Sequence, residues 1–308
     1  MAELKNEFSW SKSRENCFLR CSRQYFLTYY GSWGGWDKRA DERTRAIYIY
    51  KQLQSRQQWI GATVHNCLRW VLATLRKKGT APEEETALGN LAKRLQVDFQ
   101  DSGEGLYWDN PKAHCALLEH EYEDLDVPED EWRALTEKAL HCVSAFYHSE
   151  VLKNLTALPR EHWLELEDLA SFDLDGVKVW VQLDCAHRDG DGARIFDWKT
   201  GKADTAATRS QLALYTLYAA AKWSLAPEAI AAMEFNLATG ETFEHRALPA
   251  DLDGARARVA ESAAAMKALL DDPGANVARE EPFALTDNER TCRYCNYRRV
   301  CPKFQGAE

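Results

Sequence analysis

The amino-acid sequence predicts a mixed α/β fold, in which flanking helices surround a mixed β-sheet core, with a helical insertion before the core and a cysteine-bearing segment after it. Three observations carry this prediction. Apolar residues recur at helical spacing through residues 51–158, apolar and polar residues alternate in short runs within residues 159–275, and residues 276–308 hold three closely spaced cysteines. Residues 1–50, which are basic and aromatic, complete a chain of four parts.

The helical part begins with a long amphipathic stretch. Between residues 51 and 78, apolar side chains recur three and four positions apart, and Gly79 ends the pattern. The positions are Ile60, Val64, Cys67, Leu68, Val71, Leu72 and Leu75. Similar spacing predicts further helices at roughly 83–100, 112–125 and 129–153.

The character of the sequence changes at Pro159, after which three runs alternate apolar and polar residues. The intervening DLDG and HRDGDG are typical of turns, so the runs predict an antiparallel meander. Its strands lie near 162–170, 177–187 and 193–198. A helix near 206–223, strands near 229–238 and 241–248, and a helix near 251–271 complete the predicted core.

The net charge of −9 argues at first against a nucleic-acid partner, but the charge is unevenly distributed. Residues 1–60 hold eleven Lys/Arg against six Asp/Glu, residues 80–175 hold seven against twenty-three, and residues 290–303 hold five basic side chains and no acidic one. Phosphate binding needs a local positive surface rather than a basic whole, so the two ends keep DNA as a candidate partner. Without an apolar run of eighteen residues or a secretory start, we expect a cytoplasmic protein with no membrane partner.

Two carboxylates and a lysine form the first candidate site. Asp184 ends the second predicted strand, and Asp197 and Lys199 lie on the third. Because strand side chains alternate, Asp197 and Lys199 project from one face, and pairing of the two strands brings Asp184 near them. Carboxylates of this kind suit Mg²⁺. The alternative is a surface hairpin with a cross-strand salt bridge, which a D-x-K triplet alone favours.

Two further features are uninformative when taken singly. His65 lies among apolar residues of a predicted helix, where a lone histidine is more often packed than a ligand. Gln211 and Tyr215 are four residues apart, so they share one face of the helix that follows the strand of Lys199.

Taken together and in this order, Gly61-x-x-x-His65, the strand-ending Asp184, the segment Asp197-Trp-Lys-Thr-Gly and Gln211-x-x-x-Tyr215 resemble the RecB-like branch of the PD-(D/E)XK nuclease superfamily. That branch includes the RecB and AddB nuclease domains, the CRISPR-associated Cas4 proteins and exonuclease V. The resemblance implies a restriction-endonuclease-like mixed sheet. The sequence departs from the branch at Val181, where glycine is frequent, and lacks the proline of the superfamily name.

The resemblance also implies roles for individual residues. His65, Asp184 and Asp197 would be ligands of Mg²⁺ or Mn²⁺, with the backbone carbonyl of Trp198 as a further ligand. Lys199 would be the catalytic lysine, and Gln211 and Tyr215 would position DNA or that lysine. A glutamate on the first strand is also usual. Glu165 and Glu167 both qualify and share a strand face, and the sequence does not decide between them.

Five of the nine cysteines form the second candidate site. Cys292-x2-Cys295-x5-Cys301 lies near the C-terminus, and three thiolates so close would repel unless a metal neutralised them. A fourth ligand must come from elsewhere, and Cys17 and Cys21 are the candidates; four apart, they would share one face of a helix. The remaining four cysteines, at positions 67, 115, 142 and 185, sit singly among apolar residues and are typical of a core.

The iron–sulfur members of the same branch have one cysteine before the nuclease core and three after it. Cys21-Ser-Arg-Gln-Tyr-Phe resembles their upstream segment, which favours Cys21 over Cys17. The resemblance therefore implies a [4Fe–4S] cluster on Cys21, Cys292, Cys295 and Cys301, a C-terminal iron–sulfur clip that ties the two ends of the chain together. Zinc is the less favoured occupant.

These observations lead to a hypothesis of function. We expect a Mg²⁺- or Mn²⁺-dependent deoxyribonuclease, an exonuclease on single-stranded or end-containing DNA that serves repair, recombination or CRISPR-type defence, with a helicase or CRISPR-adaptation partner. Basic tail residues would anchor DNA, and aromatic residues 18–36 would stack on unpaired bases or fill a core. A second hypothesis is a non-catalytic nucleic-acid-binding or assembly module on a nuclease fold. A third is another metal-dependent hydrolase, which the absence of a P-loop, a nucleophile elbow and an H-E-x-x-H motif weakens.

Overall fold

The structure is a computed structural model that describes residues 4–201 and 205–304. A five-stranded sheet with the order β1-β4-β5-β6-β7 lies at its centre, and β2 and β3 form a separate two-stranded sheet. Strands β5 and β6 are parallel and every other pair is antiparallel. The strands are β1 (Trp163–Glu165), β2 (Leu169–Leu174), β3 (Val177–Gln182), β4 (Cys185–Asp189), β5 (Gly192–Lys199), β6 (Ile230–Asn236) and β7 (Thr242–His245). The expected mixed α/β fold is confirmed.

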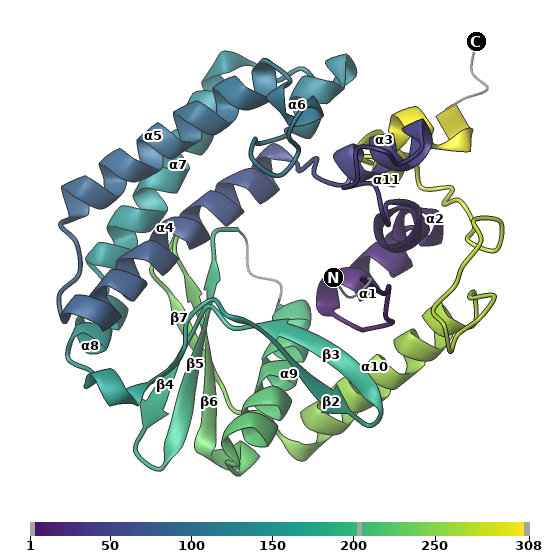
Figure 1. The fold of residues 1–308 in the computed structure, drawn as a ribbon. Coiled ribbons are helices and arrows are strands. Elements are labelled where there is room, and N and C mark those ends of the chain that lie inside the picture. Colours follow the sequence, from purple (N-terminus) through teal and green to yellow (C-terminus); the bar gives the residue numbers. More distant parts are fainter. Residues whose placement is uncertain (1–3, 202–204, 305–308) are drawn as a thin grey trace.

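Helices cover both faces of the five-stranded sheet (Figure 1). Alternate residues of β6 enter two different hydrophobic clusters, Met233 and Phe235 on the side of α4 and Ala232 on the side of α9. Every residue of β6 is buried, as expected for a strand covered on both faces. The first layer contains α4 (Arg56–Lys78), α5 (Glu84–Gly103), α7 (Glu129–Tyr147) and α8 (Glu150–Thr156), and the second contains α9 (Thr205–Trp223) and α10 (Pro249–Lys267).

Helix α4 has clear sequence signals at both ends. Ser55 and Gln58 form a reciprocal capping box, and Gly79 takes a left-handed conformation with φ of 79° at the C-terminal end. The helix therefore begins five residues after the start that periodicity alone suggested. Among the described residues, no helix has the length and apolar character needed to cross a membrane.

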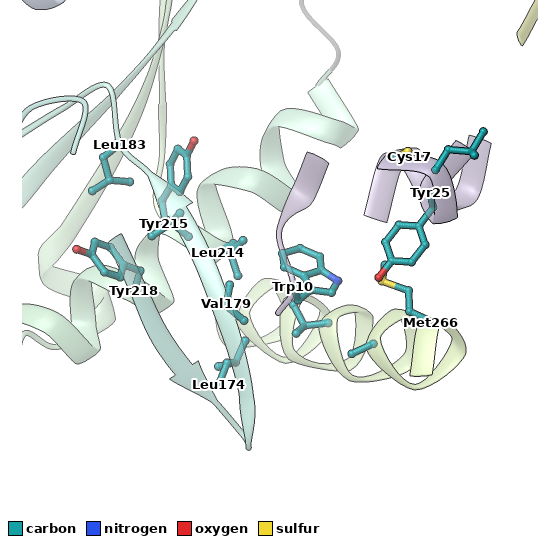
Figure 2. Packing of buried hydrophobic residues seen from close by; sticks show 14 of the residues in the cluster. Trp10, Cys17, Tyr25, Leu174, Val179, Leu183, Leu214, Tyr215, Tyr218 and Met266 are labelled. Atoms are coloured by element: carbon teal, nitrogen blue, oxygen red, sulfur yellow. The ribbon is translucent and has the colours of Figure 1, made fainter. Parts of the chain in front are cut away.

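The two ends of the chain lie side by side (Figure 1). The Nε of Arg23 donates to the carbonyl of Phe283 at 2.7 Å, and the hydroxyls of Thr28 and Tyr297 are 3.0 Å apart. Before α1, Trp10 bonds to the backbone of β3 and packs between that strand and α10 (Figure 2). The terminal helices are α1 (Lys12–Arg20), α2 (Ser22–Phe26), a π-helical turn (Leu27–Gly31), α3 (Glu42–Tyr50) and α11 (Glu289–Arg293).

Two expectations about secondary structure need correction. The first two runs of the expected meander each split in two, because Glu167 has a φ of 52° and the chain changes sheet between β3 and β4. The helix expected at 112–125 is wrong: only α6 (Leu118–Glu121) is α-helical, because the backbone of Gln54 pairs with that of Ala116 and Leu118. Short 3-10 turns lie at 106–108, 123–125, 160–162, 227–229, 298–300 and 302–304.

Candidate active site and cysteine pocket

Strand β5 presents Asp197 and Lys199 on the face that α9 covers. Lys199 Nζ lies 2.6 Å from Asp197 Oδ2, while Phe196 and Trp198 pack on the opposite face with the residues of α4 and α7. Asp197 is only 3% exposed, whereas the side chain of Lys199 is 29% exposed. The lysine can therefore be reached from solvent while its carboxylate partner is held in place.

Gln211 of α9 closes a hydrogen-bond network around this ion pair. Its Oε1 accepts from Lys199 Nζ at 3.2 Å, and its Nε2 donates to Asp197 Oδ1 at 3.1 Å and to the hydroxyl oxygen of Tyr215 at 2.6 Å. Burial raises the pKa of Tyr215 well above its usual range, so the phenol stays neutral. Gln211 thus holds the ammonium and the carboxylate in one geometry.

His65, Glu167 and Asp184 form a second group beside the first. Their ligand atoms all lie within 4.8 Å of one another, and His65 Nδ1 is 3.3 Å from both Glu167 Oε1 and Asp184 Oδ1. Position 61 of α4 lies beside the end of β5, since a Cβ there would be in ordinary van der Waals contact with Thr200 Oγ1 at 3.5 Å. Helix α4 thus places His65 beside two carboxylates that follow strands of different sheets, Glu167 after β1 and Asp184 after β3.

Glu167 and Glu165, which were expected to share a face, do not. The positive φ of Glu167 interrupts the strand alternation. Glu167 Oε2 accepts from Gln182 Nε2 at 2.8 Å, whereas Glu165 accepts a hydrogen bond from the hydroxyl of Tyr218. In Figure 2 the hydroxyls of Tyr215 and Tyr218 point in different directions from α9. Glu167 therefore belongs to the histidine group and Glu165 lies elsewhere.

The charges of the site depend on one another. Burial lowers the pKa of His65, but the charge and hydrogen bonds of Asp184 and Glu167 outweigh it and raise that pKa to about 10. Burial, and then the negative charge of Asp184, raise the pKa of Asp197 to about 6 despite the nearby Lys199. The site therefore holds three carboxyl groups, of Glu167, Asp184 and Asp197, against two basic side chains, of His65 and Lys199.

The donor set fits a divalent cation. Carboxylate oxygens suit Mg²⁺ and Mn²⁺, and an imidazole nitrogen is a common metal ligand. A cation bound between His65, Glu167 and Asp184 would replace the proton on the histidine, because metal ligation requires the neutral ring. The three ligand atoms are close enough for one ion to reach them all.

Asp197 and Trp198 lie at the edge of this group. The backbone N–H of Trp198 donates to Asp184 Oδ2 at 2.5 Å, and the Trp198 indole is buried in the core. Asp197 is engaged by Lys199 and Gln211 rather than by His65. Metal ligation by Asp197 and by the carbonyl of Trp198 stays a prediction.

Two residues near the site were missed by the sequence analysis. Gln182 orients Glu167, and Glu234 of β6 is paired with Asp197 in the parallel register and is 3% exposed. A single acidic residue inside the apolar strand 230–236 was the available signal for Glu234. Nothing in the periodicity marked Gln182.

Four cysteines line one pocket, which we call the cysteine pocket: Cys21, Cys292, Cys295 and Cys301. Cys17 does not line it; its Sγ lies 3.9 Å from Thr28 Oγ1 in the core. The expectation that Cys17 and Cys21 share a helix face is wrong, because α1 ends at Arg20 and Cys21 is extended, with φ of −165°. All nine cysteines are free thiols.

Burial affects two of the thiols that line the cysteine pocket. Burial raises the pKa of Cys295 to about 12 and also raises that of Cys301. A bound metal would ionise such thiols, since a coordinating thiol loses its proton. Four thiols converging from both ends of the chain are a donor set that fits a four-thiolate centre.

Arg298 and Arg299 of the basic tail, which were expected to be available to DNA, form ion pairs within the protein. Arg298 NH1 is 2.8 Å from Asp124 Oδ1 and Arg299 Nε is 2.7 Å from Glu121 Oε1. Lys303 donates to the carbonyl of Thr286. Of the tail residues expected to anchor DNA, which are Arg293, Arg298, Arg299 and Lys303, two are thus neutralised by acidic side chains from the middle of the chain.

The aromatic N-terminal segment divides between core and surface. Tyr25 and Phe26 are buried, whereas Trp33 and Trp36 are 40% and 43% exposed. At most part of this segment can therefore contact a ligand.

Comparison with known proteins places these features in a family context. A family model described as the PD-(D/E)XK nuclease superfamily matches residues 9–302. A solved structure described as "Crystal structure of SSO0001" is 18% identical, with a TM-score of 0.30, over 60% of this chain and 78% of the other. No curated protein matches significantly.

Proposed function

We propose that this chain, which belongs to the PD-(D/E)XK nuclease superfamily, is a Mg²⁺- or Mn²⁺-dependent deoxyribonuclease. Membership of the superfamily suggests a nuclease, and its members typically use divalent metals. The observation that carries the proposal is the placement of His65, Glu167 and Asp184 beside the Asp197–Lys199 ion pair. A metal group and a reachable ammonium next to each other are what phosphodiester hydrolysis requires.

Each side chain has a role in this proposal. His65, Glu167 and Asp184 hold the cation, with Asp197 and the carbonyl of Trp198 as further ligands. The cation polarises the phosphodiester and lowers the pKa of a bound water. Lys199 orients the attacking water or stabilises the developing negative charge, and Gln211 fixes Lys199 by accepting its hydrogen bond at 3.2 Å.

The alternative of a non-catalytic module has less support. A binding module has no need of a buried carboxylate, a lysine and a glutamine held in one network. Buried charges are costly, so their retention around a reachable lysine favours catalysis. The non-catalytic alternative predicts that Asp197 and Lys199 are dispensable.

We also propose a [4Fe–4S] cluster in the cysteine pocket. Cys21, Cys292, Cys295 and Cys301 line one pocket, so one cysteine before the nuclease core and three after it come together. This three-plus-one arrangement is similar to that of the iron–sulfur members of the RecB-like branch, and it supports a cluster over a single zinc ion.

The DNA substrate is proposed to be single-stranded or to contain free ends, with exonucleolytic cleavage. Repair, recombination and CRISPR-type defence are the proposed settings, with a helicase or a CRISPR-adaptation protein as partner. These proposals rest on the likeness of the motif set, from Gly61 to Tyr215, to the RecB-like branch.

The test is incubation with end-labelled single-stranded and duplex DNA in the presence of Mg²⁺, Mn²⁺ or a chelator. We expect cleavage with either metal, none with chelator, and end-first product ladders. Absence of cleavage on every DNA, or cleavage that persists in chelator, would contradict the proposal.

A further inference from the structure

A cavity of about 420 Å³ opens beside the candidate active site. Three distant parts of the chain form it: residues 11–14 at the start of α1, the β2–β3 hairpin, and α9. Backbone hydrogen bonds between Trp10 and β3 hold the start of α1 against that hairpin. The cavity is thus fixed by the fold rather than by a loose loop.

The cavity is continuous with both halves of the site. Gln211 and Tyr215, which belong to the lysine network, line it. Gln182, which donates to Glu167 of the histidine group, lines it as well. A ligand in this cavity would therefore lie next to a phosphodiester bound at the metal group.

The wall opposite α9 carries positive charge. Lys12 and Arg14 line the cavity. Lys12 pairs with Glu15, which also pairs with Arg258, whereas Arg14 forms no ion pair within the described part of the chain. Basic side chains therefore outnumber acidic ones at this wall, which suits an anion.

The hairpin supplies an aromatic surface. Trp180 lines the cavity and is partly exposed. Lys178 Nζ lies 5.1 Å from its ring centroid. Tyr29 lines the cavity too, but two cations lie over its ring, with Arg14 only 4.2 Å from the centroid, whereas one cation lies over Trp180. Trp180 is therefore the less covered of the two rings and the one better placed to stack with a base.

We propose that this cavity binds one unpaired nucleotide adjacent to the scissile phosphodiester, with its base against Trp180 and its phosphate at Arg14 and Lys12. The volume is in the range of small-ligand sites, and stacking plus a cationic wall is how unpaired nucleic acid is bound. A base held in a duplex must leave its stack to enter, so the cavity makes the site select single strands. This inference rests on the proposed nuclease function and names its substrate class.

The test measures binding and cleavage of a fluorescein-labelled twelve-residue oligothymidylate and of its duplex with oligoadenylate. Binding is measured in the Lys199→Ala background, so it does not depend on turnover. The variants are Trp180→Ala, Trp180→Phe and Arg14→Gln. The matched controls are Trp108→Ala, an exposed tryptophan outside the cavity, and Arg133→Gln, an exposed arginine of α7.

We expect Trp180→Ala to weaken single-strand binding and raise KM about 5- to 100-fold, and Trp180→Phe to restore most of it. Arg14→Gln should weaken binding and reduce the slope of log affinity against log salt by about one. Duplex binding and both controls should change less than about twofold. Single-strand binding by Trp180→Ala and Arg14→Gln that equals the controls overturns the inference.

Cross-linking of a 5-iodouracil-containing single strand gives a readout on the unsubstituted chain. Cross-links at Trp180 or Tyr29 support the cavity, and cross-links confined to other residues contradict it, even where Trp180→Ala fails to fold. A chain that binds single strands through Trp180 but cleaves no DNA would overturn the nuclease proposal and keep the cavity. Cleavage that depends on Lys199 but not on Trp180 or Arg14 would overturn the cavity proposal and keep the nuclease proposal.

Discussion

The candidate active site and the cysteine pocket both join residues far apart in the sequence, but they differ in what holds them together. In the active site the side chains of the two groups pair with one another: Lys199 pairs with Asp197, and His65 lies between Asp184 and Glu167. In the cysteine pocket four thiols line one cavity, and no charged side chain pairs with them within the described residues. The first site is organised by the protein, whereas the proposed metal would complete the second.

This difference predicts opposite consequences of metal loss. Removing the divalent cation should abolish catalysis and leave the fold, because the carboxylates keep their protein partners. Removing the metal of the cysteine pocket should loosen the contact between the ends of the chain, because metal binding in such sites is largely folding energy. Four predictions test this contrast.

The largest effect should come from the lysine. Lys199→Ala, and likewise Asp197→Ala, should lower the cleavage rate roughly 10²- to 10³-fold or more. The first removes the ammonium that stabilises the developing negative charge, and the second removes the partner of that ammonium and a proposed metal ligand. The melting temperature and the iron content should stay close to those of the unsubstituted protein. The control is Lys153→Ala, whose side chain is 74% exposed and pairs only with Glu150. Turnover that survives in Lys199→Ala would mean that β5 is not the catalytic strand.

The second prediction concerns the cysteine pocket. Cys21→Ser should lose its iron and lower the melting temperature by about 5 °C or more, because one of four ligands to the metal is gone. Cys17→Ser should keep its iron and cost about 1 kcal/mol, the typical cost of a single substitution, because Thr28 Oγ1 lies beside the replaced group. Iron analysis and thermal unfolding measure both.

Two outcomes would change this assignment. Iron retained in Cys21→Ser but lost in Cys17→Ser would mean that the fourth ligand is Cys17, in the core, and not Cys21. One zinc and no iron in the unsubstituted protein would replace the cluster by a zinc site and leave the link between the chain ends in place.

The third prediction compares the two glutamates. Glu167→Gln should raise the Mg²⁺ concentration for half-maximal activity about 10- to 100-fold, because it removes a carboxylate from the histidine group. Glu165→Gln should leave that concentration within about twofold, because its carboxylate is held by Tyr218. A metal titration of the cleavage rate separates them, and a larger effect of Glu165→Gln would contradict the structure.

The smallest effect should come from the tail arginines. Arg298→Ala should change single-strand affinity less than twofold and cost at most about 1 kcal/mol of stability, because Asp124 already neutralises its charge at a partly exposed site. Filter binding and thermal unfolding check both quantities. A large loss of DNA affinity would show that DNA displaces Asp124.

Much of the fold was visible in the sequence. Helical spacing and the glycine at position 79 predicted α4 and its end, although not its start at Arg56. Strand alternation placed Asp197 and Lys199 on one face of β5, and helical spacing placed Gln211 and Tyr215 together on α9. These are relations within one element, where the backbone period alone fixes which side chains share a face.

Relations between elements were decided by the tertiary structure. Glu167 has a positive φ at the point where the chain passes from one sheet to the other, and Glu167 rather than Glu165 therefore lies next to His65. The end of α1 at Arg20 pointed Cys21, and not Cys17, into the cysteine pocket.

The sequence by itself therefore determined most of the secondary-structure types, the spacing of the chemical groups and the family to which they are similar, and the resemblance favoured Cys21. Only the tertiary structure decided which glutamate lies beside His65, placed Cys17 in the core, and showed that Asp124 and Glu121 neutralise the tail arginines. The physical reason is the sequence separation over which the deciding interactions act. Periodicity and capping depend on neighbours within a few residues, whereas partner choice depends on packing between segments up to 280 positions apart, which no local pattern records.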